Sequence, residues 1–339
     1  MFSDLIKKLL YASGALGLYH RLRNARTLTV IMFHRVLEPG DPRWAHCDPD
    51  YTLRADLFAQ CLGFFASHYN MVTAHDVLRA RRGEGGLPDR ALLITFDDGW
   101  RDNVDFALPA MRIRKVPGLM FVVADAVGRD APFYQEQIVG AWRRGRLDTA
   151  TLARALQGAG DTQAAATSDD LDALRHLIAR VESLTPPVRA ALLDTLNDRL
   201  PDGLRHMINA DELRQLDEGG VAIGLHGKTH LPMTAAPDLD AELAGARADM
   251  AARLPQRDPP ATMSFPHGRF DAPIAQRARE AGYELVFTSV PVVNPTAGKV
   301  GWLLGRLGFE NGTVSDRQGR FRPDLLALYL FRRPGRVLA

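Results

Sequence analysis

The stretch Leu92–Trp100, LLITFDDGW, constrains the fold of this chain more than any other segment. Apolar and β-branched residues run up to Phe96, and two carboxylates and a glycine follow, which is typical of a buried strand ending in a charged turn. Catalytic groups of parallel α/β folds gather at such strand ends. Adjacent carboxylates there are costly unless a cation neutralises them or one keeps a proton. The alternative is structural, with Asp98 in a tight turn and Asp97 capping the next helix.

Strand and helix patterns alternate on both sides of this segment. The alternation predicts a parallel α/β sheet or barrel. A helix over Trp100–Met111 is expected directly after the central strand, with Pro109 limiting its end. The other predicted strands are Leu28–Phe33, Met71–Thr73, Gly118–Ala124, Val221–Leu225, Ala261–Phe265, Glu284–Ser289 and Val300–Phe309.

The region from Gly128 to His206 breaks this rhythm, because it contains no strand pattern. It is longer than an ordinary loop, so we expect an inserted helical subdomain over residues 129–206. The barrel would then comprise residues 28–128 and 207–320. Within the insertion, helices are expected around Tyr134–Arg144, Leu171–Glu182 and Pro187–Leu200. An exposed helix face is the expected place of Arg143, Arg144 and Arg146, with an anionic ligand as the alternative.

Both ends of the chain lie outside the barrel pattern. Residues 1–27 combine basic residues with the apolar run Leu9–Tyr19, which is too short to span a bilayer. This predicts an amphipathic helix that docks on the domain or lies on a membrane surface, with a signal peptide as the less favoured alternative. We therefore expect a cytoplasmic protein, peripheral to the inner membrane. Residues 321–339 are expected to form a basic, peripheral tail.

Composition excludes some classes of partner. The formal net charge is only +2, which gives no argument for nucleic acid. Two cysteines are too few for a disulfide framework or a cysteine metal knuckle. The sequence does not indicate an oligomeric state.

Polar residues follow several predicted strands at their exits: His34, Asp97, Asp98, His226 and His267, with His230 four residues later. In a closed parallel barrel these ends share one face. Two histidines at i and i+4 with one carboxylate can hold a catalytic zinc and leave one position open. The second carboxylate would then be free to act as a base. The same ligand set describes a non-haem iron oxygenase, which remains an alternative.

Three motifs in this order resemble those of the polysaccharide deacetylase family, the carbohydrate esterases that share the NodB homology domain. They are TFDDG at Thr95–Gly99, HGKTH at His226–His230 and SFPHG at Ser264–Gly268. MFHRV at Met32–Val36 is similar to the opening strand of the branch that acts on surface and exopolysaccharides. The resemblance covers residues 28–128 and 207–310. It implies a distorted (β/α)7-type barrel, here with a helical insertion.

The resemblance also implies an activity. A member of this family would be a metal-dependent hydrolase. It would remove N-acetyl groups from an amino sugar in a bacterial surface polysaccharide or lipid-linked glycan. By position, Asp97 would be the general base, and Asp98, His226 and His230 would bind zinc or another divalent metal. The backbone N–H of His267 would help to bind the oxyanion.

Two departures from the family pattern leave roles open. Many members carry a base-orienting arginine where this chain has Ser264; Arg306 in the last strand is the expected replacement, with an ordinary ion pair as the alternative. No histidine follows His267, so the general acid stays open between His267, His34 and a proton returned through Asp97. A structural role is the other interpretation of His34.

Other functions fit the same motifs. One is a deformylase or other amidase acting on a lipid-linked sugar. Another is a catalytically inactive, carbohydrate-binding member of the fold.

Overall fold

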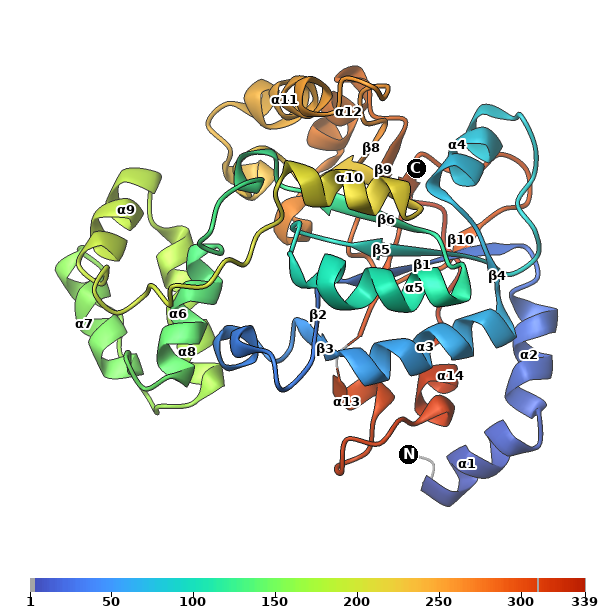
Figure 1. Ribbon diagram of the computed structural model, residues 1–339, viewed down its shortest axis with the longest axis horizontal. Helices are drawn as coiled ribbons and strands as arrows, with labels where there is room; N and C mark the ends of the chain where they lie inside the picture. Colours follow the sequence, from blue (N-terminus) through green and yellow to red (C-terminus); the bar gives the residue numbers. More distant parts are fainter. Residues whose placement is uncertain (1–3, 310, 339) are drawn as a thin grey trace. The chain divides into compact units, whose positions relative to one another are not determined.

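The computed structural model describes residues 4–309 and 311–338, which divide into two compact units (Figure 1). Unit 1 comprises Met1–Glu38, Asp50–Gly128 and Ile208–Ala339, and unit 2 comprises Pro39–Pro49 and Arg129–Met207. Residues 1–3, 310 and 339 belong to the expected N-terminal helix, barrel and tail, and lie outside the described residues.

A ten-stranded sheet forms the centre of unit 1. Eight strands follow the hydrogen-bonded order β10-β1-β5-β6-β7-β8-β9-β11, and β4 and β12 pair with β5 and β1 beside this path. Every pairing is parallel except that of β10 with β1. The strands are β1 Thr27–Phe33, β4 Asn70–Met71, β5 Ala91–Phe96, β6 Gly118–Val122, β7 Val221–Leu225, β8 Thr262–Ser264, β9 Leu285–Phe287, β10 Asn294–Pro295, β11 Leu303–Leu304 and β12 Leu307–Gly308.

The strand β5 explains the apolar run of the central motif, because all six of its residues are buried. Successive side chains of a strand point to opposite faces. Accordingly, Leu92, Ile94 and Phe96 enter one apolar cluster, whereas Ala91 and Leu93 enter another. A strand buried on both faces needs apolar residues at every position.

The barrel nearly closes at β11 and β12. The strand β11 pairs with β9, and two residues later β12 pairs with the end of β1, so the chain crosses the gap at Gly305 and Arg306. The prediction of one continuous strand over Val300–Phe309 is therefore wrong. At the crossing, the Asn294 side chain bonds both the N–H and the carbonyl of Gly305 (2.8 and 3.0 Å), which replaces the strand ladder. The predicted distorted (β/α) barrel is confirmed.

Helices surround the sheet, and Figure 1 shows α3, α5 and α10 side by side along it. They are α1 Asp4–Ala12, α2 Ala15–Arg23, α3 Ala55–His68, α4 Ala74–Arg82, α5 Leu108–Arg114, α10 Ala210–Glu218, α11 Ala246–Arg253, α12 Ala272–Glu280, α13 Asn311–Val314 and α14 Pro323–Phe331, with π-helical turns at Asn103–Ala107 and Ala241–Gly245 and 3-10 turns at Ala124–Ala126, Met233–Ala235 and Pro266–Gly268.

Two helix predictions need correction. Pro109 does not limit the helix after β5, because it lies in the first turn of α5, where a helix needs no backbone N–H. The tail predicted over residues 321–339 is not peripheral throughout. Its helix α14 buries Leu326, Ala327, Leu330 and Phe331 completely. The apolar sequence PDLLALYLF provides this contact surface.

The expected single N-terminal helix is two helices. Gly14 adopts a left-handed conformation (φ 77°) between α1 and α2, and both helices contact α14. No helix in the described ranges 4–309 and 311–338 is long and apolar enough to cross a bilayer.

The predicted loop Arg35–Tyr51 is also more ordered than expected. It begins with strand β2, Arg35–Leu37, which pairs in parallel with β3, Thr52–Arg54, to form a separate two-stranded sheet. A 3-10 turn, Pro42–His46, follows β2.

Unit 2 has its own apolar cluster between four helices: α6 Tyr134–Arg143, α7 Thr149–Gly158, α8 Leu171–Ser183 and α9 Pro186–Asp194. The sequence did not predict α7 or the membership of Pro39–Pro49. Arg143 and Arg144, expected on an exposed face, are half-buried and donate hydrogen bonds to backbone carbonyls, whereas Arg146 is exposed as expected. Arg143 donates to Trp44 (2.6 Å) and Arg144 to Leu200 (3.2 Å). These bonds hold Pro39–Pro49 and the end of the insertion to α6.

His20 on α2 gives unit 1 an acid-sensitive contact. Its buried ring stacks on Phe331 (4.1 Å between centroids), and its Nε2 has no hydrogen-bond partner within the described part of the chain. Burial lowers the pKa of His20 to about 4. When the pH falls from 7 to 5, His20 binds a proton in the unfolded chain but not in the folded chain. The free energy of unfolding therefore decreases by about 2 kcal/mol at this group.

We therefore expect urea unfolding of the wild type to lose about 2 kcal/mol more between pH 7 and pH 5 than that of His20→Gln. His75→Gln, at an exposed position, should lose as much as the wild type. Equal losses in wild type and His20→Gln would contradict the assignment.

Candidate active site

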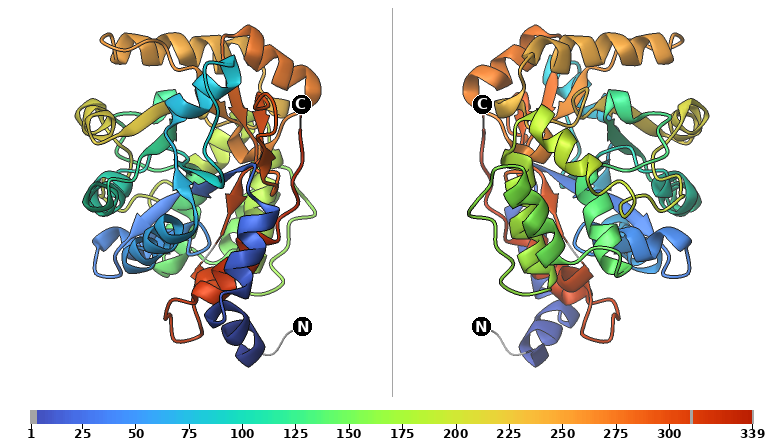
Figure 2. Two further views of the ribbon diagram at one scale, coloured as in Figure 1. Left: turned by 90° about the vertical axis from the view of Figure 1, so that its right-hand side faces the viewer. Right: turned by 90° about the vertical axis from the view of Figure 1, so that its left-hand side faces the viewer.

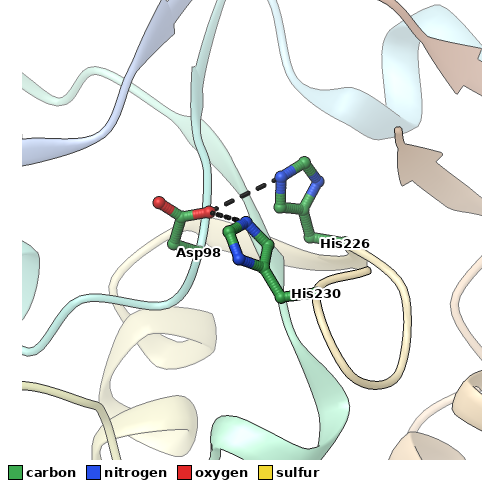
Figure 3. A group of neighbouring side chains, drawn as sticks. All are labelled: Asp98, His226 and His230. Carbon is green, nitrogen blue, oxygen red and sulfur yellow. Dashed lines mark ion pairs between the residues drawn. The ribbon is translucent and has the colours of Figure 1, made fainter. Parts of the chain in front are cut away.

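Three side chains meet at the carboxyl ends of β5 and β7: Asp98, His226 and His230 (Figure 3). Oδ1 of Asp98 lies 3.2 Å from Nε2 of His230 and 3.5 Å from Nε2 of His226. One ligand atom from each residue lies within 4.8 Å of the other two. The i, i+4 histidines thus converge on the second carboxylate of the central motif, as the spacing predicts.

The backbone at this site is strained. Asp98 (φ 77°), His230 (φ 67°) and His267 (φ 56°) all adopt left-handed conformations that residues with a Cβ rarely adopt. The described residues include only two other such positions outside glycine, Arg90 and Lys115. Strain of this kind persists where the surrounding structure enforces it, and it is concentrated at functional sites.

Asp98 is oriented by a residue that the motif analysis did not single out. Nε1 of Trp100 donates to Oδ2 of Asp98 (2.9 Å), and the guanidinium of Arg35 lies over the Trp100 ring (4.4 Å). Arg35 is itself paired with the fully buried Asp102 (2.7 Å). The other carboxylate oxygen, Oδ1, is buried and meets no donor with hydrogen-bonding geometry among the described residues. It faces the two histidines.

The hydrogen bonds of His226 define its tautomer. Its Nδ1 lies 3.0 Å from the backbone carbonyl of Ser264 and 2.7 Å from the Ser264 hydroxyl. A carbonyl oxygen can only accept, so we assign the proton to Nδ1 and the lone pair to Nε2, on the side of Asp98. Burial lowers the pKa of His226 to about 4, although Asp97 and Asp98 act in the opposite direction. The ring is therefore neutral at pH 7.

Glu242, which lies outside the recognised motifs, holds the loop that carries the two histidines. This buried carboxylate accepts from the backbone N–H groups of Lys228 (2.7 Å) and Thr229 (3.1 Å) and from the Thr229 hydroxyl. Gly227 (φ 73°) approaches it closely, since a Cβ there would lie 3.0 Å from Oε2 of Glu242. A helical residue facing a glycine-containing loop has no local sequence signature.

Asp97 forms a bidentate ion pair with Arg306, both side chains being almost fully buried. Nη1 and Nη2 of Arg306 lie 2.6 and 2.8 Å from the two oxygens of Asp97. The guanidinium also donates to the carbonyl of Thr288 (3.0 Å). Burial raises the pKa of Asp97, but Arg306 and then His226 outweigh burial and hold this pKa below its ordinary range. The structure thus places Arg306 beside the predicted base.

His34 and His267 interact with different residues of the cluster. His34 interacts electrostatically with both Asp97 and Asp98, and its ring contacts Tyr51 edge-on (5.0 Å between centroids). His267 is exposed, with its ring 4.6 Å from that of His230 and its Nε2 3.1 Å from the His230 carbonyl. All of the predicted site residues are therefore brought together, while the choice of general acid stays open.

A pocket of about 360 Å³ adjoins His34 at the ends of β1 and β12. Its walls combine aromatic rings with hydroxyl groups, from Tyr51, Thr52, Phe309, Thr313 and Tyr329. Aromatic faces beside hydrogen-bonding groups suit an amphipathic ring.

The donor set fits a divalent metal. Two imidazole nitrogens and one carboxylate oxygen are ligands of catalytic zinc, and such sites keep one position open. The buried Oδ1 of Asp98, which no donor satisfies in the described residues, and the neutral His226 with its Nε2 turned toward it are both explained by a shared cation.

Comparison with known proteins identifies the family. Residues 84–286, about three fifths of the chain, match the family model described as polysaccharide deacetylase. No curated protein matches the chain.

Solved structures share the fold. IcaB from Ammonifex degensii is 18% identical with a TM-score of 0.57, covering 91% of this chain and 98% of that one. The Streptococcus pyogenes deacetylase PplD, in complex with acetate, is 13% identical with a TM-score of 0.56, covering 90% and 99%. A de-N-acetylase from Aggregatibacter actinomycetemcomitans is 16% identical with a TM-score of 0.53, covering 84% and 95%.

The match to the family model covers the TFDDG, HGKTH and SFPHG motifs, the structures share the barrel, and the ligand atoms converge within it. The chain belongs to the polysaccharide deacetylase family and is a hydrolase of carbon–nitrogen bonds other than peptide bonds.

Proposed function

We propose that this enzyme is a zinc-dependent N-deacetylase that acts on an N-acetylated amino sugar in a bacterial surface polysaccharide or lipid-linked glycan. The observation that carries the proposal is the cluster of Asp98, His226 and His230 beside the Arg306-paired Asp97. When bound, the metal would polarise the acetamido carbonyl and acidify a water. Asp98, His226 and His230 would hold it.

Asp97 is the residue we assign as general base. Oδ2 of Asp97 lies 4.0 Å from Nε2 of His226, whereas Oδ1 of Asp98 lies 3.5 Å from it. Asp97 therefore borders the cluster but lies farther from His226 than Asp98 does. Arg306 fixes both of its oxygens and favours its charged form. Asp97 would take a proton from the attacking water, and that proton or one from His34 or His267 would go to the leaving amine.

The pocket beside His34 supports a glycan substrate. Its aromatic and hydroxyl walls could hold a sugar ring adjoining the reacting acetamido group. The oxygenase alternative finds no support in the family match, which is to hydrolases.

The direct test measures the metal content of the purified protein together with acetate release from short N-acetylhexosamine oligomers. One equivalent of zinc with acetate release supports the proposal. Zinc without acetate release would favour another acyl group, such as formyl, or a lipid-linked substrate. Protein that takes up no divalent metal would refute it.

Replacing a ligand should abolish metal binding. Asp98→Ala and His226→Ala should each weaken zinc affinity by more than the 10–100-fold typical of losing a residue that merely orients a ligand. His75→Ala, at an exposed position on α4, is the matched control and should keep full zinc content. Competition with a chelating dye gives the affinities. Unchanged affinity in both ligand variants would remove the assignment.

Replacing the base should separate metal binding from turnover. Asp97→Asn should retain zinc and lower kcat by about 10²–10⁴-fold, the usual contribution of a positioned base. Arg306→Gln should also retain zinc and lower kcat. It should cost about 3–5 kcal/mol of stability as well, because a buried carboxylate loses its partner.

The control for the arginine is Arg269→Gln, which changes an exposed residue and should alter neither kcat nor the urea midpoint. Wild-type kcat in Asp97→Asn would show that Asp97 is not the base.

A further inference from the structure

The helices α1 and α2 carry most of the exposed large apolar side chains in the described residues. Six of ten lie there: Leu5, Ile6, Leu9, Leu18, Tyr19 and Leu22, with exposed fractions between 42% and 76%. Single exposed apolar residues need no explanation, but six on two consecutive helices do.

The packing of the two helices determines which side is exposed. Leu10 and Tyr11 of α1 and Leu16 of α2 join the main apolar cluster of unit 1. On α1, Leu5 and Leu9 lie one turn apart on the side away from this contact. On α2, Leu18 and Leu22 repeat the arrangement, opposite the buried Leu16 and His20. Each helix therefore exposes a pair of leucine side chains to solvent.

The segments that include and adjoin these helices are rich in basic residues. Residues 4–26 and 332–338 hold eight Lys or Arg and one acidic residue, whereas the rest of the chain has 34 Lys or Arg against 39 Asp or Glu. The two segments are adjacent, since Nη1 of Arg23 donates to the carbonyls of Phe331 (3.1 Å) and Arg333 (2.8 Å). The helices that expose the leucine pairs thus belong to a basic part of an otherwise slightly acidic chain.

The helices α1 and α2 lie away from the active site within unit 1. The helix α2 leads into the amino end of β1, whereas the metal-binding cluster lies at the carboxyl ends of the strands. Seven residues of β1 separate the two ends, which is roughly 23 Å at the rise of a strand. Figure 2 shows α1 at the outer edge of unit 1. A partner bound there would leave the site open.

We propose that α1 and α2 bind the surface of an anionic lipid bilayer. Leu5, Leu9, Leu18 and Leu22 would enter the headgroup boundary, and exposed basic residues such as Lys8 and Arg21 would contact the headgroups. A second copy of the chain fits less well, because a two-fold interface would place this basic surface against itself. The proposal does not depend on the catalytic assignment.

The test is co-sedimentation of the full chain with vesicles, which requires no turnover. We compare vesicles of phosphatidylcholine alone with vesicles in which about one third is phosphatidylglycerol, at roughly 0.1 M salt. The wild type should bind the anionic vesicles, and higher salt should weaken the binding. The double variants Leu5→Ser/Leu9→Ser and Leu18→Ser/Leu22→Ser should each lose tenfold or more. Lys8→Glu/Arg21→Glu should lose about fivefold or more per charge.

Matched controls change equally exposed residues elsewhere. Ile113→Ser, at a side chain 80% exposed on α5, and Arg269→Glu should bind as the wild type does. Thermal unfolding checks that each variant is folded. Three results would overturn the proposal: no binding by the wild type, equal binding to neutral vesicles, or full binding by both leucine variants. Dimerisation in solution that the leucine variants abolish, without vesicle binding, would identify a second copy as the occupant instead.

Discussion

The ion pair between Asp97 and Arg306 is the interaction on which the active site depends. Two adjacent carboxylates end β5 in a buried position, and burial opposes the charge of both. Arg306 compensates Asp97 through two parallel hydrogen bonds, a geometry that only a guanidinium provides. Asp98 is then free to face the histidines. Without the arginine, Asp97 would be a buried carboxylate with no cation paired to its two oxygens.

Around this pair, each candidate ligand is held by a different partner. Trp100 bonds one oxygen of Asp98, Ser264 bonds Nδ1 of His226, and Glu242 bonds the loop that carries His230. The left-handed backbone at Asp98 and His230 is unfavourable in itself, so these bonds are needed to keep the three ligand atoms together. A site built in this way is preorganised before any metal or substrate arrives.

The features that the sequence predicts are those with a local signature. The run LLITF identifies a buried strand, and HGKTH identifies a histidine pair, since both depend on neighbours in sequence. Glu242 and α14 were not predicted, because their meaning depends on contacts between distant segments. The prediction for Pro109 was wrong and α7 was not predicted, for another reason in each case. A proline is compatible with a first turn, and TATLARALQG carries its helical spacing on only two large apolar residues, Leu152 and Leu156, beside a polar segment.

The arginine that pairs with Asp97, Arg306, does not come from the motif position that Ser264 occupies. In the strand order, β8 with Ser264 lies three strands from β5. The crossing of the chain from β9 to β1 brings Arg306 to the same carboxylate from the opposite side. Ser264 still contacts this carboxylate, because its hydroxyl donates to Oδ1 of Asp97 at 3.3 Å. The near-closure of the barrel thus brings a residue of the β11–β12 crossing to a carboxylate at the end of β5.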